Sequence, residues 1–170
     1  NFKGGVMNWG IKDEIARGVV RAVRASGRHK LLVKLLPTAE DSVALARMCE
    51  EEGADGVSLI NTLLGMVIDI HGRKAVFDNT YAGLSGPAVM PVALRMVHQV
   101  AGAVNIPVMG MGGITTWQDA VSFIMAGAAV VQVGTATFMK PGIALDIIIG
   151  LERYMDAHKI TDLREIRGIV

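Results

Sequence analysis

The sequence predicts an α/β fold in which parallel strands alternate with helices, and three observations support that class. Short runs that are almost wholly apolar, such as residues 31–35 and 129–133, alternate with longer segments of helical periodicity. Strands as apolar as these are typical of a parallel sheet covered by helices. A weak internal repeat, Thr-x-x-Asp followed by a helix that ends in Gly-Ala, starts at Thr38 and again at Thr116. We therefore expect repeated strand–helix units.

The first elements follow from periodicity and capping residues. In residues 13–26, apolar side chains recur on one helical stripe and the arginines lie outside it. Residues 31–35 form an apolar run closed by a proline, which predicts a buried strand. Thr38 and Asp41 then resemble a capping box, although the acid is Asp rather than Glu. They predict a helix that continues to about residue 52.

The middle of the chain departs from this rhythm. A strand is expected at residues 57–60, after which two short β-like runs flank His71. That pattern predicts a hairpin inserted in a strand-to-helix connection, at about residues 66–80. Ser85 is a candidate cap, with Pro87 in the first turn, for a helix that ends near residue 100.

The last elements restore the alternation. Residues 106–109 predict a strand, and the Thr-x-x-Asp motif at Thr116 predicts a capped helix that ends near residue 125. A further strand is expected at residues 129–133, followed by a helix over residues 142–158. Four strands and five helices amount to about half of a (β/α)8 barrel, because a complete barrel needs about 250 residues.

Two glycine-rich loops indicate which half of a barrel this is. The apolar runs at residues 108–114 and 131–136 each contain or end in glycine, and one helix separates them. In (β/α)8 barrels, the last two such loops and the N-terminus of a short helix commonly bind a phosphate. We therefore expect the C-terminal half of a TIM (β/α)8 barrel, with four parallel strands and flanking helices. We expect it to form a single domain over residues 1–170 and to bind a phosphorylated ligand.

Composition excludes several classes of function. The chain has 170 residues, of which 51% are apolar and 19% charged, and its net charge is +1 without any block of like charges. Nothing in this composition suggests a nucleic-acid partner. No uncharged apolar run reaches the roughly 18 residues of a membrane span. The single cysteine, Cys49, excludes an intramolecular disulfide and favours a reducing compartment, so we expect a cytoplasmic protein.

Several residues have a structural interpretation. Cys49 lies late in an expected helix and is interpreted as a small buried hydrophobic residue rather than a nucleophile. The four histidines lack metal-ligand spacing, so no metal site is expected. Trp117 falls in the first turn of a helix, where a packing role is expected.

Polar residues follow two of the apolar strands. Lys34 lies near the end of the first strand, and Asn61 and Thr62 end the second. Lys34 is either a lysine that extends to solvent at the edge of the sheet or a cation directed at an electron-rich ligand. Asn61 and Thr62 are either a turn signal or hydrogen-bonding groups for a planar heterocycle.

Three loops supply candidate phosphate ligands. Glycine allows backbone N–H groups to approach an anion closely, and a threonine adds a hydroxyl donor. Clusters of this kind in consecutive strand-to-helix loops are more specific than one glycine pair. The candidate residues are Gly86, Gly112, Gly113, Gly134 and Thr135.

Four motifs together resemble the class 1 dihydroorotate dehydrogenases. They are Asn-Thr-Leu-Leu-Gly-Met at residues 61–66, Gly-Leu-Ser-Gly-Pro at 83–87, Gly-Met-Gly-Gly-Ile at 110–114 and Val-Gly-Thr-Ala at 133–136. The first motif is most similar to that of the class 1B catalytic subunits. The resemblance extends over essentially the whole chain, which would correspond to the C-terminal half of such a subunit.

The resemblance implies a barrel that binds FMN at its mouth and oxidises dihydroorotate to orotate in pyrimidine biosynthesis. It implies that Lys34 contacts the polar edge of the flavin, where it would stabilise the negative charge of the reduced form. It further implies that Ile60 lies against the isoalloxazine ring and that Asn61 and Thr62 hydrogen-bond the pyrimidine. The ribityl phosphate would be bound by Gly86, Gly112, Gly113, Gly134 and Thr135.

The resemblance also implies what the chain lacks. In the family, a cysteine base removes the C5 proton of the substrate while hydride passes from C6 to the flavin. By similarity that cysteine would lie two positions before Asn1. We therefore expect no catalytic base within these residues and no dehydrogenase activity from the 170 residues alone.

The expected ligands, partner subunit and oligomeric state also follow, together with alternative functions. The resemblance implies dihydroorotate and orotate as ligands, and a partner subunit with FAD and an iron–sulfur cluster that passes electrons to NAD. We also expect a homodimer. Two alternatives stay open: a non-catalytic half-barrel that retains the FMN-phosphate site, and a related flavin barrel that acts on another pyrimidine, as dihydropyrimidine dehydrogenase does.

Overall fold

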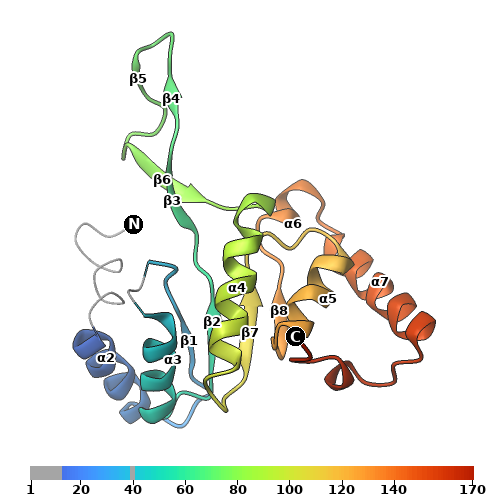
Figure 1. Cartoon of the computed structure of the whole chain (residues 1–170). Coiled ribbons are helices and arrows are strands. Elements are labelled where there is room, and N and C mark those ends of the chain that lie inside the picture. Colours follow the sequence, from blue (N-terminus) through green and yellow to red (C-terminus); the bar gives the residue numbers. More distant parts are fainter. Residues whose placement is uncertain (1–12, 39–40) are drawn as a thin grey trace.

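Four parallel strands form the central sheet of the structure, a computed structural model that describes residues 13–38 and 41–170 (Figure 1). The spatial order of the strands is their order along the chain. This arrangement confirms the expected α/β half-barrel fold. The strands are β1 (Leu32–Lys34), β2 (Gly56–Leu59), β7 (Val108–Met111) and β8 (Val130–Gln132).

Helices cover one face of this sheet and contact one another in chain order (Figure 1). Each connection between neighbouring parallel strands contains a helix, as parallel pairing requires. A short helix, α6 (Ala136–Met139), directly follows the loop after β8. The longer helices are α2 (Asp13–Ala25), α3 (Ser42–Glu51), α4 (Met90–Ala101), α5 (Trp117–Met125) and α7 (Ile143–His158).

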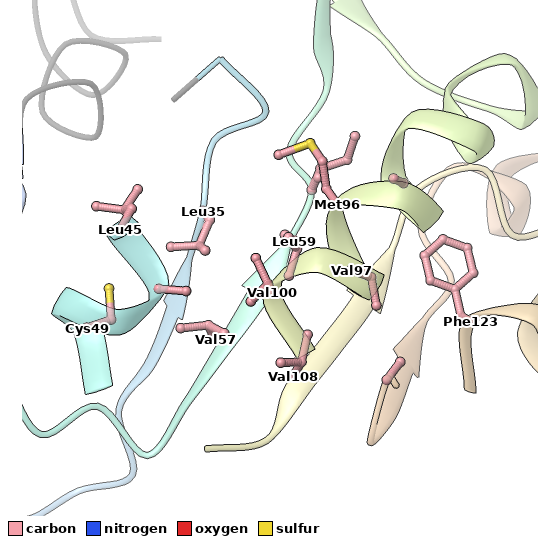
Figure 2. Packing of buried hydrophobic residues seen from close by; sticks show 14 of the residues in the cluster. Leu35, Leu45, Cys49, Val57, Leu59, Met96, Val97, Val100, Val108 and Phe123 are labelled. Carbon is pink, nitrogen blue, oxygen red and sulfur yellow. The ribbon is translucent and has the colours of Figure 1, made fainter. Parts of the chain in front are cut away.

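The hydrophobic core lies between the sheet and these helices (Figure 2). Val57 and Leu59 of β2 are fully buried there, as are Val97 of α4 and Phe123 of α5. Gly110 of β7 permits this packing, because a Cβ added there would lie 2.6 Å from Phe123 Cδ1. The absence of a side chain in the strand therefore makes room for the phenyl ring.

The opposite face of the sheet has no covering layer among the described residues. Successive strand residues point to opposite faces. The register therefore places Lys34 beside Ser58, Ser58 beside Met109, and Met109 beside Val130 on the face away from the helices. Val130 is 49% exposed and Leu32, on the same face of β1, is 52% exposed. In a barrel this face points to the interior.

The helix starts confirm one sequence prediction and correct two. Thr116 caps α5 in a capping box with Asp119, as predicted. Thr38 does not cap α3, because Asp41 is the N-cap and its carboxylate accepts from the backbone N–H groups of Val43 and Ala44. Asp41 directly precedes the first helical residue, Ser42, whereas Thr38 lies four positions before it.

Ser85 is not a helix cap either. A 3-10 turn, η1 (Pro87–Val89), precedes α4, and its N-cap is Gly86, whose side chain cannot form a capping hydrogen bond. The Ser85 hydroxyl instead forms a hydrogen bond with Thr135. Pro87 lies in the first turn, as predicted.

An antiparallel arm lies between β2 and α4 and projects away from the sheet (Figure 1). Its base pairs β3 (Leu63–Met66) with β6 (Tyr81–Leu84), and its tip pairs β4 (Ile68–Asp69) with β5 (Lys74–Ala75). The paired strands thus extend over residues 63–84, beyond the predicted 66–80. Gly83 belongs to β6, where it pairs with Leu64.

Two properties of the described residues bear on function. No helix in residues 13–38 and 41–170 is both long and apolar enough to cross a membrane. In the same residues, no three His, Cys, Asp or Glu side chains gather into a group that could bind a metal.

Candidate functional site

A cavity of about 370 Å³ opens at the carboxyl ends of the parallel strands. Every residue that the sequence singled out as a ligand-binding candidate lines this one cavity. The tertiary structure therefore brings together positions that span 102 residues of the chain, from 34 to 135. The nine residues are Lys34, Ile60, Asn61, Thr62, Gly86, Gly112, Gly113, Gly134 and Thr135.

The loop after β7 forms a close-packed glycine turn. Gly112 and Gly113 have φ angles of +125° and +80°, a region that other residues rarely adopt. A Cβ added at Gly113 would lie 2.8 Å from the carbonyl oxygen of Gly86, and one at Gly112 would lie 2.9 Å from Ala93 Cβ. Both positions therefore require glycine, for backbone conformation and for space.

Backbone donors of these loops are available to a ligand. Within the described part of the chain, no hydrogen bond uses the backbone N–H groups of Gly112, Gly113, Gly134 or Thr135. Unpaired N–H groups at the edge of a cavity form a suitable environment for an anion. The loops after β7 and β8 can thus surround a phosphate with neutral donors.

The loop after β8 is held by its own hydrogen bonds. The Thr137 hydroxyl and backbone N–H donate to the carbonyl oxygen of Gly134, at 2.7 Å and 3.0 Å. Gly134 itself has open space on its Cβ side, since no atom of the described residues lies within 4 Å of an added Cβ. The Thr135 hydroxyl lies 2.9 Å from the Ser85 hydroxyl, which links this loop to the one before η1.

Lys34 lies at another side of the cavity, at the end of β1. Its ammonium group forms no ion pair or hydrogen bond with any residue that the structure describes. The side chain is exposed and lies on the sheet face away from the helices, beside Ser58. A cation in this position is available to an electron-rich ligand.

Asn61 has a defined orientation. Its side-chain oxygen accepts a hydrogen bond from the backbone N–H of Thr62 at 2.8 Å. The amide nitrogen of Asn61 is therefore left to donate to a ligand. Asn61 therefore organises a local turn, and its hydrogen bonding to a planar heterocycle stays a prediction.

Thr62 connects the cavity to the antiparallel arm. A Cβ added at Gly83 of β6 would lie 2.6 Å from Thr62 Oγ1, so the threonine packs directly on the backbone of that strand. Because Thr62 also lines the cavity, the base of the arm determines where its hydroxyl lies.

Apolar side chains form the remaining wall. Ile60 is 3% exposed, and its backbone N–H donates to the carbonyl oxygen of Met111 at 3.0 Å. Val89 and Met111 are also buried at this wall. The peptide bond between Leu59 and Ile60 is cis. A flat aromatic ligand can lie against such a surface.

Three polar residues line the cavity that the sequence did not single out as ligands: Ser85, Thr115 and Gln132. Gln132 is a polar residue in an otherwise apolar strand, and Ser85 directly precedes a candidate glycine. These two local signals could have indicated that Gln132 and Ser85 line the cavity. Thr115 is engaged with Asp119, to which its hydroxyl donates at 3.1 Å.

Cys49 lies outside the cavity. It is completely buried on α3, within the core between the helices and the sheet (Figure 2). Burial raises the pKa of its thiol from 9.0 to about 11. A neutral, inaccessible thiol does not act as a base or nucleophile, which confirms the structural interpretation.

The geometry of the cavity defines a class of protein. Anion-binding loops at the carboxyl ends of parallel strands are characteristic of barrel-type α/β proteins that bind phosphorylated ligands. Here the same cavity adds a lysine, an amide donor and a flat apolar wall, which suit a phosphorylated ligand with a planar ring.

The family follows from comparison with known proteins. Residues 1–155 match the family model described as dihydroorotate dehydrogenase. The chain therefore belongs to the dihydroorotate dehydrogenase family. Its curated relatives are catalytic subunits of dihydroorotate dehydrogenase B (NAD(+)), to which it is homologous over nearly its whole length, as the class 1B resemblance predicted.

Individual relatives define the extent of the similarity. The chain is 51% identical over 168 residues to the subunit of Alkaliphilus oremlandii, covering 99% of this chain and 56% of that protein. It is 50% identical over 170 residues to that of Petrotoga mobilis, covering 100% of this chain and 57% of that protein. The chain thus spans about half the length of the curated relatives it matches.

A solved structure supports the fold independently. The dihydroorotate dehydrogenase of Eimeria tenella, crystallised in complex with ferulenol, superposes with a TM-score of 0.77 at 21% identity. The match covers 93% of this chain and 48% of that chain.

Proposed function

We propose that this chain provides the FMN-binding and pyrimidine-binding side of an enzyme that oxidises dihydroorotate to orotate. The observation that supports this most directly is the single cavity lined by all nine residues that the resemblance nominated. Membership of the dihydroorotate dehydrogenase family is the second support.

The cavity fits the phosphate of FMN. A Cβ at Gly112 or Gly113 would collide with neighbouring side chains or backbone, whereas Gly86 and Gly134 leave open space on their Cβ side among the described residues, so an anion can approach the backbone of those two residues closely. Their unpaired N–H groups would donate to the phosphate oxygens. FMN bound there would supply the oxidising chemistry, by taking up the two electrons removed from dihydroorotate.

Residues of the chain would orient both molecules. Lys34 would face the polar edge of the ring system, where its positive charge stabilises added negative charge. Ile60 would provide a flat apolar contact and exclude water from one face of the ring. The Asn61 amide and the Thr62 hydroxyl would hydrogen-bond the pyrimidine and hold it in a fixed position against the ring.

Proton removal would require a group from elsewhere in the enzyme. Cys49, the single cysteine of the chain, is buried on the covered side of the sheet and its pKa is raised to about 11. In this proposal, the chain's other cavity-lining side chains bind and orient FMN and the pyrimidine, and they do not remove a proton. We accordingly assign no general base to these residues.

The assembly proposed is that of the class 1B enzymes. The names of the relatives give NAD(+) as their oxidant. We propose that electrons pass through a partner subunit with FAD and an iron–sulfur cluster, and that the catalytic subunit is a homodimer.

The experiment is anaerobic reduction of the purified full-length protein. Bound FMN is identified by its absorbance and by chromatography after denaturation. Addition of dihydroorotate is expected to bleach the flavin absorbance, whereas dihydrouracil is not. Absence of flavin after reconstitution with FMN would refute the cofactor assignment. Bleaching by dihydrouracil and not by dihydroorotate would show that the substrate is another pyrimidine.

A further inference from the structure

Two hydroxyl groups that are 50 residues apart meet at the edge of the cavity. Thr135 Oγ1 donates to Ser85 Oγ at 2.9 Å, and both residues line the cavity. Thr135 ends the loop after β8, and Ser85 ends the connection from the antiparallel arm. Among the described residues, this hydrogen bond links the loop after β8 to the segment that follows β6.

The neighbouring glycines show how closely the loops converge. Gly86, next to Ser85, has a φ of +93°, so the chain turns sharply directly after the serine. The Gly86 carbonyl oxygen lies 2.8 Å from the position of a Cβ at Gly113 and accepts from the Val89 N–H at 3.1 Å. Ser85 is therefore placed beside both glycine loops.

A count of protons shows that one hydroxyl proton of this pair stays available. Each hydroxyl has one proton, and the bond between them uses one of the two. With Thr135 as the donor, the Ser85 proton is left for a third partner in the cavity. Thr137, two residues after Thr135, donates its hydroxyl proton to the Gly134 carbonyl oxygen, so that proton is not available.

We propose that Ser85 is a phosphate-binding residue and that Thr135 acts partly through it, as a positioning residue. The Ser85 hydroxyl donates to a phosphate oxygen while it accepts from Thr135, so that the two loops and the anion form one hydrogen-bonded chain. This inference rests on the proposed function, because it takes the phosphate of FMN as the ligand. Hydrogen bonds in such chains polarise one another, which couples the two residues.

The test is a double-mutant cycle on flavin affinity in the full-length protein. Ser85→Ala, Thr135→Val and the double variant are compared for binding of FMN and of riboflavin, by quenching of flavin fluorescence. Ser85→Ala is expected to weaken FMN binding about tenfold, the effect of losing one hydrogen bond to a charged group. Riboflavin, which has no phosphate, is expected to bind the variant and the wild type equally.

The coupling is read from the double variant. Because Thr135 acts partly through Ser85, the double variant is expected to lose less affinity than the product of the two single losses. Ser85→Thr retains a hydroxyl and is expected to bind FMN within about twofold of wild type, as one hydrogen bond is kept. Ser122→Ala, which removes a hydroxyl bonded to Gln118 on α5, is the control for loss of a hydroxyl outside the cavity.

Each contrary outcome is informative. Unchanged FMN affinity in Ser85→Ala, an equal loss for riboflavin, or a double loss equal to or greater than the product of the single losses would each overturn the inference. Failure of the wild-type protein to bind FMN would instead overturn the proposed function. The two failures are therefore distinguishable in the same experiment.

Discussion

The Trp117 indole packs directly on the backbone of Gly150, so that a Cβ added at Gly150 would lie 2.2 Å from Trp117 Cγ. This contact joins the first turn of α5 to the middle of α7. Tyr154, one turn further along α7, lies against the same indole with ring centroids 5.8 Å apart. The absence of a side chain at Gly150 is therefore what allows the two helices to approach.

Gly150→Ala is expected to destabilise the protein although alanine favours helices. The added methyl collides with the indole, and overpacking of this kind costs about 1–3 kcal/mol. Gly18→Ala in α2 is the matched control, because no atom in residues 13–38 and 41–170 lies within 4 Å of its added Cβ. It is expected to stabilise by up to about 1 kcal/mol through helix propensity. Urea unfolding of both variants checks the prediction, and equal shifts of the two midpoints would contradict it.

Gly134→Ala is expected to weaken FMN binding without affecting folding. The backbone there does not require glycine, and the added methyl enters open space beside the unpaired N–H groups. Loss of one charge-assisted hydrogen bond, worth about 1.5–3 kcal/mol, weakens affinity by about tenfold or more. Gly142→Ala, which also adds a methyl in open space but lies outside the cavity, is the control. Equal FMN affinity in the two variants would place the phosphate elsewhere.

Lys34→Ala is expected to slow reduction of the bound flavin by dihydroorotate about hundredfold. Removal of a cation that stabilises developing negative charge costs about 3 kcal/mol at such a site. Stopped-flow absorbance under anaerobic conditions measures the rate. Lys74→Ala on the arm, outside the cavity lining, is expected to leave it unchanged. A wild-type rate in Lys34→Ala would remove the lysine from the mechanism.

The contact between α2 and α3 is expected to weaken in acid. Hydrogen bonds from Arg21 and Arg17 lower the pKa of Glu52, next to the end of α3, from 4.5 to about 2. A carboxylate whose pKa is lower in the folded state stabilises that state above pH 4.5. The contribution is lost progressively as the pH falls from about 4.5 to about 2.

A comparison of variants across pH checks this. Glu52→Gln is expected to be less stable than wild type at pH 6, with the difference in urea midpoint shrinking toward pH 2. Glu152→Gln is the control, since Glu152 forms no ion pair with a described residue. A Glu52→Gln difference that is constant with pH would show that the carboxylate charge does not contribute.

Local sequence was sufficient for most of the fold. The alternation of apolar runs with helical periodicity predicted all four parallel strands, and the Thr116 capping box was predicted and is present. These features depend on residues within a few positions of one another. The predicted strand ends were also sufficient to nominate Lys34, Asn61 and the glycines, because parallel strands end at the same edge of a sheet.

What the sequence by itself determined is therefore the set of elements and the residues at their ends. Only the tertiary structure decided which of these residues meet. The Ser85–Thr135 hydrogen bond joins positions 50 residues apart, and Thr62 packs on Gly83 of β6, beyond the predicted end of the hairpin. Periodicity and capping act within one element, whereas these contacts depend on how separate loops pack together, which no local pattern records.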